Sequence, residues 1–173
     1  MNAKNMVSTV SALAFSLVAG LAMAGGDHAG GHHHDSDAIG EPGKVVDVKR
    51  KISVDMTDAM RFMPSSISVK QGETVKLLVK NSGKVKHEMV LGSEKELKEH
   101  SEAMKKFPEM EHADPNMVTV QPGQTGEIIW KFSKAGVINF ACLQPGHYDA
   151  GMKGAVKVAA TGHSDDGHGT HKH

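Results

Sequence analysis

Cysteine is almost absent from this sequence, because Cys142 is the only one among 173 residues. A disulfide framework requires cysteines in pairs, so no disulfide forms within the chain. A net charge is also missing, since 20 basic residues balance 20 acidic ones. This balance gives no argument for binding to nucleic acid or to an anionic membrane surface.

Long apolar runs are lacking as well, apart from one near the N-terminus. That run covers residues 10–24, follows the positive charge of Lys4 and ends in the small-x-small motif Ala22-Met23-Ala24. It is too short to span a bilayer comfortably, and no stop-transfer charges follow it. The pattern predicts a signal peptide over residues 1–24, export to the periplasm and a soluble mature protein without membrane insertion.

Histidine and methionine, in contrast, are abundant, with 12 and 11 residues. Eight of the histidines lie in two Gly/His/Asp-rich tails, residues 25–43 and 161–173. The tails have too few apolar residues to pack, so we expect both to be disordered without metal. Imidazole, thioether and thiolate together form the ligand set that suits copper.

Between the tails, over residues 44–160, short runs of alternating apolar and polar residues are separated by turn signals. Apolar residues on even positions from 46 to 56 predict one strand with a buried face. Further strands are expected around 67–69, 75–79, 89–91, 118–120, 128–132, 138–142 and 156–158. Seven or eight strands at this spacing predict an all-β domain, an antiparallel sandwich or Greek-key barrel.

One segment, residues 93–107, breaks the alternation because it consists mostly of strong helix formers. Ser93 is an N-cap candidate, Glu96 stands at the capping-box position, and Pro108 follows the segment. The segment therefore predicts a short helix inserted in the loop between two strands.

The chemistry is concentrated in the segment C-L-Q-P-G-H-Y-D-A-G-M. Cys142 ends a predicted strand, and His147 and Met152 follow on a Gly/Pro loop that can fold back so that the three side chains converge. His87, between two predicted strands, supplies a fourth donor. Two imidazoles, a thiolate and a weak axial thioether form a blue-copper site. The alternatives are a buried core thiol, a zinc site, for which a thioether is a poor ligand, and a purely packing role for Met152.

These features resemble the cupredoxin family of plastocyanins, azurins and auracyanins. The resemblance covers roughly residues 44–160 and includes N-S-G-K-V-K-H ahead of the first ligand, the turn Q-P-G-Q-T, the strand V-I-N-F-A-C and the C-x4-H-x4-M loop. The chain is still more similar to periplasmic copper-tolerance cupredoxins of the CopI type, with His-rich tails, an M-R-F-x-P element and an H-E pair. The resemblance implies a cupredoxin β-sandwich and a type 1 copper, Cu(I)/Cu(II), held by His87, Cys142, His147 and Met152.

One residue departs from the pattern of plastocyanin and azurin. Those proteins usually have Asn after the first His ligand, where it ties the two ligand loops together, whereas this sequence has Glu88. We expect a carboxylate there to alter the hydrogen bonding around the metal and its potential.

Secondary metal sites are a further hypothesis. Methionine and histidine side chains in the loops and the inserted helix could form a softer Cu(I) site. The candidates are Met56, Met60, Met63, His100, Met104, Met110, His112 and Met117. The favoured interpretation is that these residues pack the helix and loops onto the domain. The N-terminal tail either chelates metal loosely or is a solvated linker, and its candidate ligands are His28, His32, His33 and His34.

The function predicted from the sequence is copper tolerance. A periplasmic protein with redox-active copper would bind or buffer copper and serve a redox or copper-transfer partner. The alternative is a dedicated electron shuttle between respiratory or photosynthetic complexes, although a shuttle does not need metal-binding tails. A multicopper oxidase or nitrite reductase would place His beside the type 1 Cys, whereas Ala141 and Leu143 flank Cys142. Other catalytic sequence patterns are missing too. We therefore expect that the protein is not an enzyme.

Overall fold

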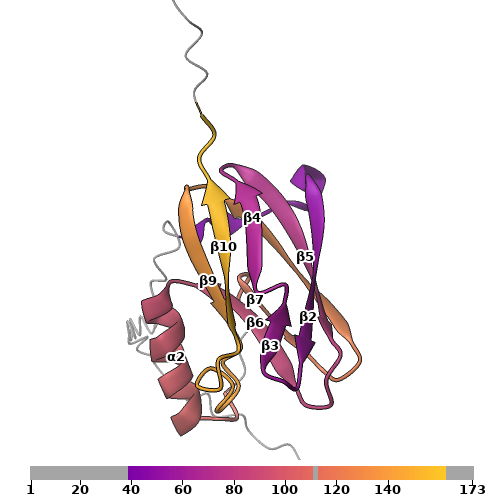
Figure 1. Cartoon of the computed structure of the whole chain (residues 1–173), viewed down its shortest axis with the longest axis vertical. Helices are drawn as coiled ribbons and strands as arrows, with labels where there is room; N and C mark the ends of the chain where they lie inside the picture. Colours follow the sequence, from indigo (N-terminus) through magenta and orange to yellow (C-terminus); the bar gives the residue numbers. More distant parts are fainter. Residues whose placement is uncertain (1–38, 111–112, 163–173) are drawn as a thin grey trace, which may run out of the picture. The chain divides into compact units, whose positions relative to one another are not determined.

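The computed structural model describes residues 39–110 and 113–162, so the predicted signal peptide and most of both tails lie outside the described residues. The described residues form two five-stranded sheets packed face to face, with one helix on the outside (Figure 1). Their elements are β1 (Glu41–Pro42), a 3-10 turn η1 (Val45–Asp47), β2 (Arg50–Thr57), β3 (Arg61–Met63), β4 (Ser66–Lys70), β5 (Glu73–Asn81), β6 (His87–Gly92), α2 (Glu94–Lys106), β7 (Met117–Val120), β8 (Thr125–Phe132), β9 (Gly136–Ala141) and β10 (Lys153–Ala159).

The two sheets have the strand orders β1-β8-β5-β2-β3 and β4-β10-β9-β6-β7. The all-β sandwich is confirmed, but the expectation of purely antiparallel sheets is wrong in two places. β2 pairs with β5, and β4 with β10, in parallel. The chain crosses to the second sheet at β4 before β5 returns beside β2 in the same direction, so these neighbours are not joined by a hairpin.

Side chains on alternating positions of both sheets form the core. On β5, Val75, Leu77 and Val79 are fully buried, whereas the intervening Lys76 and Leu78 are more exposed. Val156 and Val158 of β10 face the same cluster from the second sheet. The period-two alternation therefore identified these strands correctly, since each such side chain gains about 1.5–3 kcal/mol by leaving water.

The first predicted strand begins later than the alternation suggested. Val45–Asp47 form the 3-10 turn, and Val46 is 87% exposed. Sheet pairing starts at Arg50, which lies opposite Val75 of β5. Residues 45–47 have no strand beside them, so their backbone bonds are local, as in the bond from the Val48 N–H to the Val45 carbonyl. Hydrophobic alternation cannot specify a strand without a partner.

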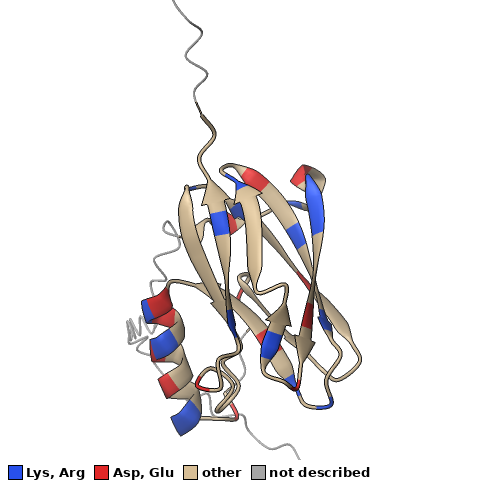
Figure 2. Cartoon of the chain, viewed as in Figure 1, with Lys and Arg blue, Asp and Glu red and all other residues tan. Residues whose placement is uncertain are grey.

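The inserted helix is confirmed as α2. The Ser93 hydroxyl accepts the N–H of Glu96, and the Glu96 carboxylate accepts the N–H of Ser93, which completes the capping box. Leu97 and Met104 pack against Leu143 and neighbours on the second sheet, while charged residues of both signs lie along the helix (Figure 2). Among the described residues, no helix has the length and apolarity to cross a membrane.

Candidate metal centre

The pairing of β6 with β9 brings the predicted ligands together from distant parts of the sequence. The two strands are antiparallel neighbours, with Val90 opposite Ala141. The start of β6 therefore lies beside the end of β9, which places His87 next to Cys142. Both side chains are fully buried at this end of the sandwich.

The loop from Cys142 to Met152 folds back on itself through its own backbone. The N–H of Cys142 donates to the Met152 carbonyl at 3.1 Å, and the N–H of Met152 donates to the His147 carbonyl at 3.0 Å. Gly146 adopts a φ of +83°, a conformation that favours glycine, at the turn just before His147. The convergence predicted from the C-x4-H-x4-M spacing follows from these bonds.

Three of the four predicted donors surround one point. His87 Nδ1 lies 3.2 Å from His147 Nδ1, and Cys142 Sγ lies 3.3 Å from His147 Nδ1 and 4.0 Å from His87 Nδ1. Metal bonds of about 2.0 Å to nitrogen and 2.3 Å to sulfur, in a trigonal plane, would separate such donors by ~3.5–3.8 Å. The observed separations bracket this range, so the donor set fits a single copper ion.

Met152 ends the same loop, and its N–H donates to the His147 carbonyl. It is fully buried and belongs to the same apolar cluster as Cys142. This position is compatible with the weak axial thioether of a type 1 site, and the axial role of Met152 stays a prediction.

Burial affects the protonation of two candidate ligands, Cys142 and His147. It raises the pKa of the Cys142 thiol to about 12, the Glu88 carboxylate adds to this rise, and the N–H groups of Glu88 and Gln144 oppose it. Burial, together with the neighbouring His87, also holds the pKa of His147 below its usual range. At neutral pH the His147 imidazole is therefore neutral and able to bind a metal, and a metal bound here would have to displace the thiol proton of Cys142.

Glu88 makes the tie between the two ligand loops that the resemblance assigns to Asn. Its carboxylate accepts the backbone N–H of Leu143 at 3.0 Å and the side-chain amide of Gln144 at 3.0 Å. Its own backbone N–H donates to Cys142 Sγ at 3.4 Å. Glu88 is buried, and its carboxylate oxygens accept from both neighbours.

Three further residues support the site and were missed as functional residues. Asp58 Oδ1 lies 3.2 Å from His87 Nε2. The Arg61 guanidinium donates to the carbonyl of Ala150 in the ligand loop at 3.0 Å, and the buried Asn81 amide donates to the Val85 carbonyl at 2.8 Å. Arg61 and Asn81 belong to motifs already noted, M-R-F-x-P and N-S-G, whereas nothing in the sequence distinguishes Asp58 from an ordinary turn residue.

The residues of the hypothetical secondary sites are spread over the domain. Met56 and Met104 are buried in two separate apolar clusters, and Met63 is 62% exposed on β3. Met110 and Met117 line a hollow of about 230 Å³ that Glu88 also borders. Met60 is partly buried against the core and His100 lies on α2, while His112 and the tail histidines His28, His32, His33 and His34 lie outside the described residues.

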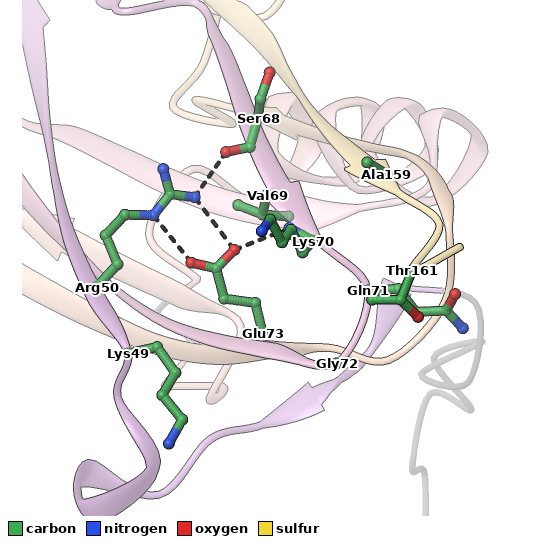
Figure 3. Close-up of a pocket in the computed structure, with 10 residues that line it drawn as sticks. All are labelled: Lys49, Arg50, Ser68, Val69, Lys70, Gln71, Gly72, Glu73, Ala159 and Thr161. Carbon is green, nitrogen blue, oxygen red and sulfur yellow. Dashed lines mark hydrogen bonds and ion pairs between the residues drawn. The ribbon is translucent and has the colours of Figure 1, made fainter. Parts of the chain in front are cut away.

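A second hollow lies far from the ligand loop. It has a volume of about 680 Å³ and borders Ala159, at the opposite end of β10 from Met152 (Figure 3). Two of its four charged lining residues pair with each other, since the Arg50 guanidinium binds the Glu73 carboxylate at 3.0 Å. In the described part of the chain, His87, Cys142 and His147 are the one group of three or more His, Cys, Asp or Glu side chains that could hold a metal ion.

A β-sandwich that brings a thiol and two imidazoles to one point at its end has the architecture of a mononuclear copper protein. The comparisons with known proteins agree. A model of the copper binding proteins of the plastocyanin/azurin family matches residues 48–159. The chain belongs to this family.

Its curated relatives include two copper-resistant cuproproteins named CopI. The chain is 49% identical over 135 residues to CopI of Rubrivivax gelatinosus, with 78% of this chain and 82% of that protein covered. It is 36% identical over 150 residues to CopI of Pseudomonas aeruginosa, with 70% of this chain and 82% of that protein covered. Copper is therefore the metal of this family.

Solved structures show the same fold. Reduced auracyanin from Roseiflexus castenholzii superposes with a TM-score of 0.56 at 22% identity, covering 65% of this chain and 98% of that one. Auracyanin B superposes with a TM-score of 0.55 at 24% identity, covering 65% of this chain and 90% of that one. At this level of identity the likeness supports the sandwich and not a particular activity.

Proposed function

We propose that this chain is a periplasmic type 1 copper protein that serves copper tolerance, and that it holds one copper through His87, Cys142, His147 and Met152. The observation that carries the proposal is the convergence of one thiol and two imidazole nitrogens within 3.2–4.0 Å. Bound copper would supply one-electron chemistry between Cu(I) and Cu(II). The protein supplies a largely buried donor set.

The role in tolerance is supported by the relatives and by the sequence outside the domain. Both relatives described above are named copper-resistant cuproproteins. The predicted signal peptide would place the protein where copper first enters the cell, and the His-rich tails would add binding capacity. A dedicated electron shuttle would need only the type 1 copper site and not the tails.

The surroundings of Cys142 support a binding role without catalysis. Ala141 and Leu143 flank it and are buried in an apolar cluster with α2 residues. Neither can relay electrons through an imidazole to another copper cluster. We therefore propose a copper-binding and redox-active protein that is not an enzyme.

The site is tested by optical spectroscopy and metal analysis of the full-length protein. The Cu(II) form is expected to show an intense visible thiolate-to-copper band, which Cys142→Ser abolishes. Met104→Leu, a change in another buried sulfur side chain on α2, is the matched control and keeps the band. A band that persists in Cys142→Ser would refute the assignment.

The physiological role is tested by growth. A strain lacking the protein is expected to grow normally without added copper and poorly with it, and a Cys142→Ser copy is expected not to rescue growth. A defect confined to one respiratory condition, at every copper level, would favour the electron shuttle instead.

A further inference from the structure

We propose that Asp58 is a positioning residue of this copper site. Its carboxylate accepts the Nε2–H of His87, directs the Nδ1 lone pair to the metal and stabilises the Cu(II) form. The inference rests on the proposed function, because it concerns the same metal.

The geometry of His87 carries the first step. One ring nitrogen, Nε2, faces Asp58 Oδ1 at 3.2 Å, while the other, Nδ1, faces His147 Nδ1 at 3.2 Å and Cys142 Sγ at 4.0 Å. A neutral imidazole has one protonated nitrogen and one lone pair. A carboxylate can only accept, so the proton of neutral His87 resides on Nε2 and the lone pair on Nδ1, on the side of the other donors.

Asp58 is itself held in place by the segment that leads into His87. It lies in the turn between β2 and β3. The Lys84 N–H donates to Oδ2 at 2.8 Å, and the Val85 N–H donates to Oδ1 at 3.4 Å. Gly83 leaves the necessary space, since a Cβ at that position would overlap the carboxylate. One side chain thus orders the loop before β6 and orients the first residue of β6.

The charge of Asp58 carries the second step. A carboxylate hydrogen-bonded to a ligating imidazole makes that imidazole a stronger donor. It also places a negative charge close to the metal, which favours the more highly charged ion. Both effects stabilise Cu(II) more than Cu(I), so Asp58 lowers the reduction potential of the centre.

The test compares Asp58→Asn with Asp55→Asn in the full-length, copper-loaded protein. Asp55 binds the same loop, through the Ser82 hydroxyl at 2.6 Å, and lies on the neighbouring strand β2. Asp58→Asn is expected to weaken Cu(II) binding ~10- to 100-fold, with a smaller loss for Cu(I). For each factor of ten by which the loss of Cu(II) affinity exceeds the loss of Cu(I) affinity, the reduction potential rises by about 59 mV. Asp55→Asn is expected to leave the potential unchanged.

A second readout separates orientation from loop order. In the diamagnetic Cu(I) form, NMR is expected to show the His87 Nε2 proton protected from exchange in the parent and exchanging faster in Asp58→Asn. Equal losses of Cu(I) and Cu(II) affinity, an unchanged potential or an unprotected Nε2 proton in the parent would each overturn the inference. A parent protein without the thiolate band would instead refute the proposed function.

Discussion

At the scale of single residues, hydrogen bonds from neighbouring groups hold the candidate ligands. The Glu88 N–H donates to the Cys142 sulfur, and the Glu88 carboxylate accepts the next backbone N–H, that of Leu143. His87 is fixed through its outer nitrogen by Asp58. Contacts of this kind fix the orientation of ligating side chains.

Met152→Leu tests the axial thioether. The substitution nearly conserves volume, so we expect it to cost less than about 1.5 kcal/mol in stability and to retain copper. Loss of a weak donor to Cu(II) raises the reduction potential. Voltammetry of the variant and of Met104→Leu, the same change at a buried position on α2, provides the measurement. An equal potential in all three proteins would mean that Met152 is not axial.

Glu88→Gln tests the tie between the ligand loops. The amide can still accept one N–H, but its NH2 group then faces a second donor, either the Leu143 N–H or the Gln144 amide. We expect a loss of about 1–3 kcal/mol in the unfolding free energy of the metal-free protein. Thr119→Val is the control, because Thr119 contacts Glu88 only at 3.5 Å. Equal denaturation midpoints for parent and Glu88→Gln would contradict the assigned role.

At the scale of secondary structure elements, the site depends on which strand ends meet. The antiparallel pair β6 and β9 joins two ligands, and the connection from β9 to β10 carries the others. At the far end of the sandwich, a carboxylate links three strands by hydrogen bonds. There Arg50 of β2 and the Lys70 N–H of β4 both donate to the Glu73 carboxylate at the start of β5 (Figure 3).

This cluster predicts a pH dependence of stability. Burial raises the pKa of Glu73, but the Lys70 N–H and Arg50 outweigh it, so the pKa lies below its ordinary value of 4.5. A lowered carboxyl pKa contributes stability above the unfolded pKa, and this contribution is lost as the pH falls through the folded pKa. Glu73→Gln is therefore expected to cost about 1 kcal/mol at pH 7 and progressively less below pH ~4.

Urea denaturation of the metal-free protein at pH 7 and at pH 3 measures how much unfolding free energy Glu73→Gln removes. Glu99→Gln is the control, because Glu99 pairs with Lys95 on the exposed surface of α2 at 4.0 Å. Such a pair contributes less than about 0.5 kcal/mol. The same loss for Glu73→Gln at pH 7 and pH 3 would show that its charge is not responsible.

At the scale of the whole molecule, the described domain and the His-rich tails are separate in sequence. The last strand, β10, leads away from the ligand loop for roughly 20 Å and ends at Ala159. At the other end, Ile39 is buried, and its carbonyl accepts the Trp130 indole N–H at 2.7 Å. Ile39 is therefore part of the domain, and a tail deletion that spares the fold stops at residue 38.

Deletion of residues 25–38 and 163–173 tests whether the tails bind metal. Neutral imidazoles bind Cu(II) at neutral pH, so we expect fewer copper ions per chain with an unchanged visible band. Equilibrium dialysis with copper analysis gives the stoichiometry. A full-length variant with all tail histidines changed to serine controls for chain length. Equal stoichiometry in all forms would identify the tails as linkers.

The sequence by itself determined the elements that depend on local pattern. Alternation located most strands, the Ser93 and Glu96 capping box located α2, and the C-x4-H-x4-M spacing placed three candidate ligands on one loop. These features involve neighbours within a few residues, where side-chain period and hydrogen-bonding reach decide the outcome.

Only the tertiary structure decided the parallel pairing of β2 with β5, the 3-10 turn at Val46, and the partners of the ligands. Asp58 is 29 residues from His87, and Glu88 is 55 from Leu143. Such contacts exist because strand pairing brings distant backbone together, and nothing local in the sequence encodes which carboxylate will face which ligand. The candidate ligands and the unusual Glu88 were therefore readable in advance, whereas the partners of Glu88 and the position of Asp58 beside His87 were not.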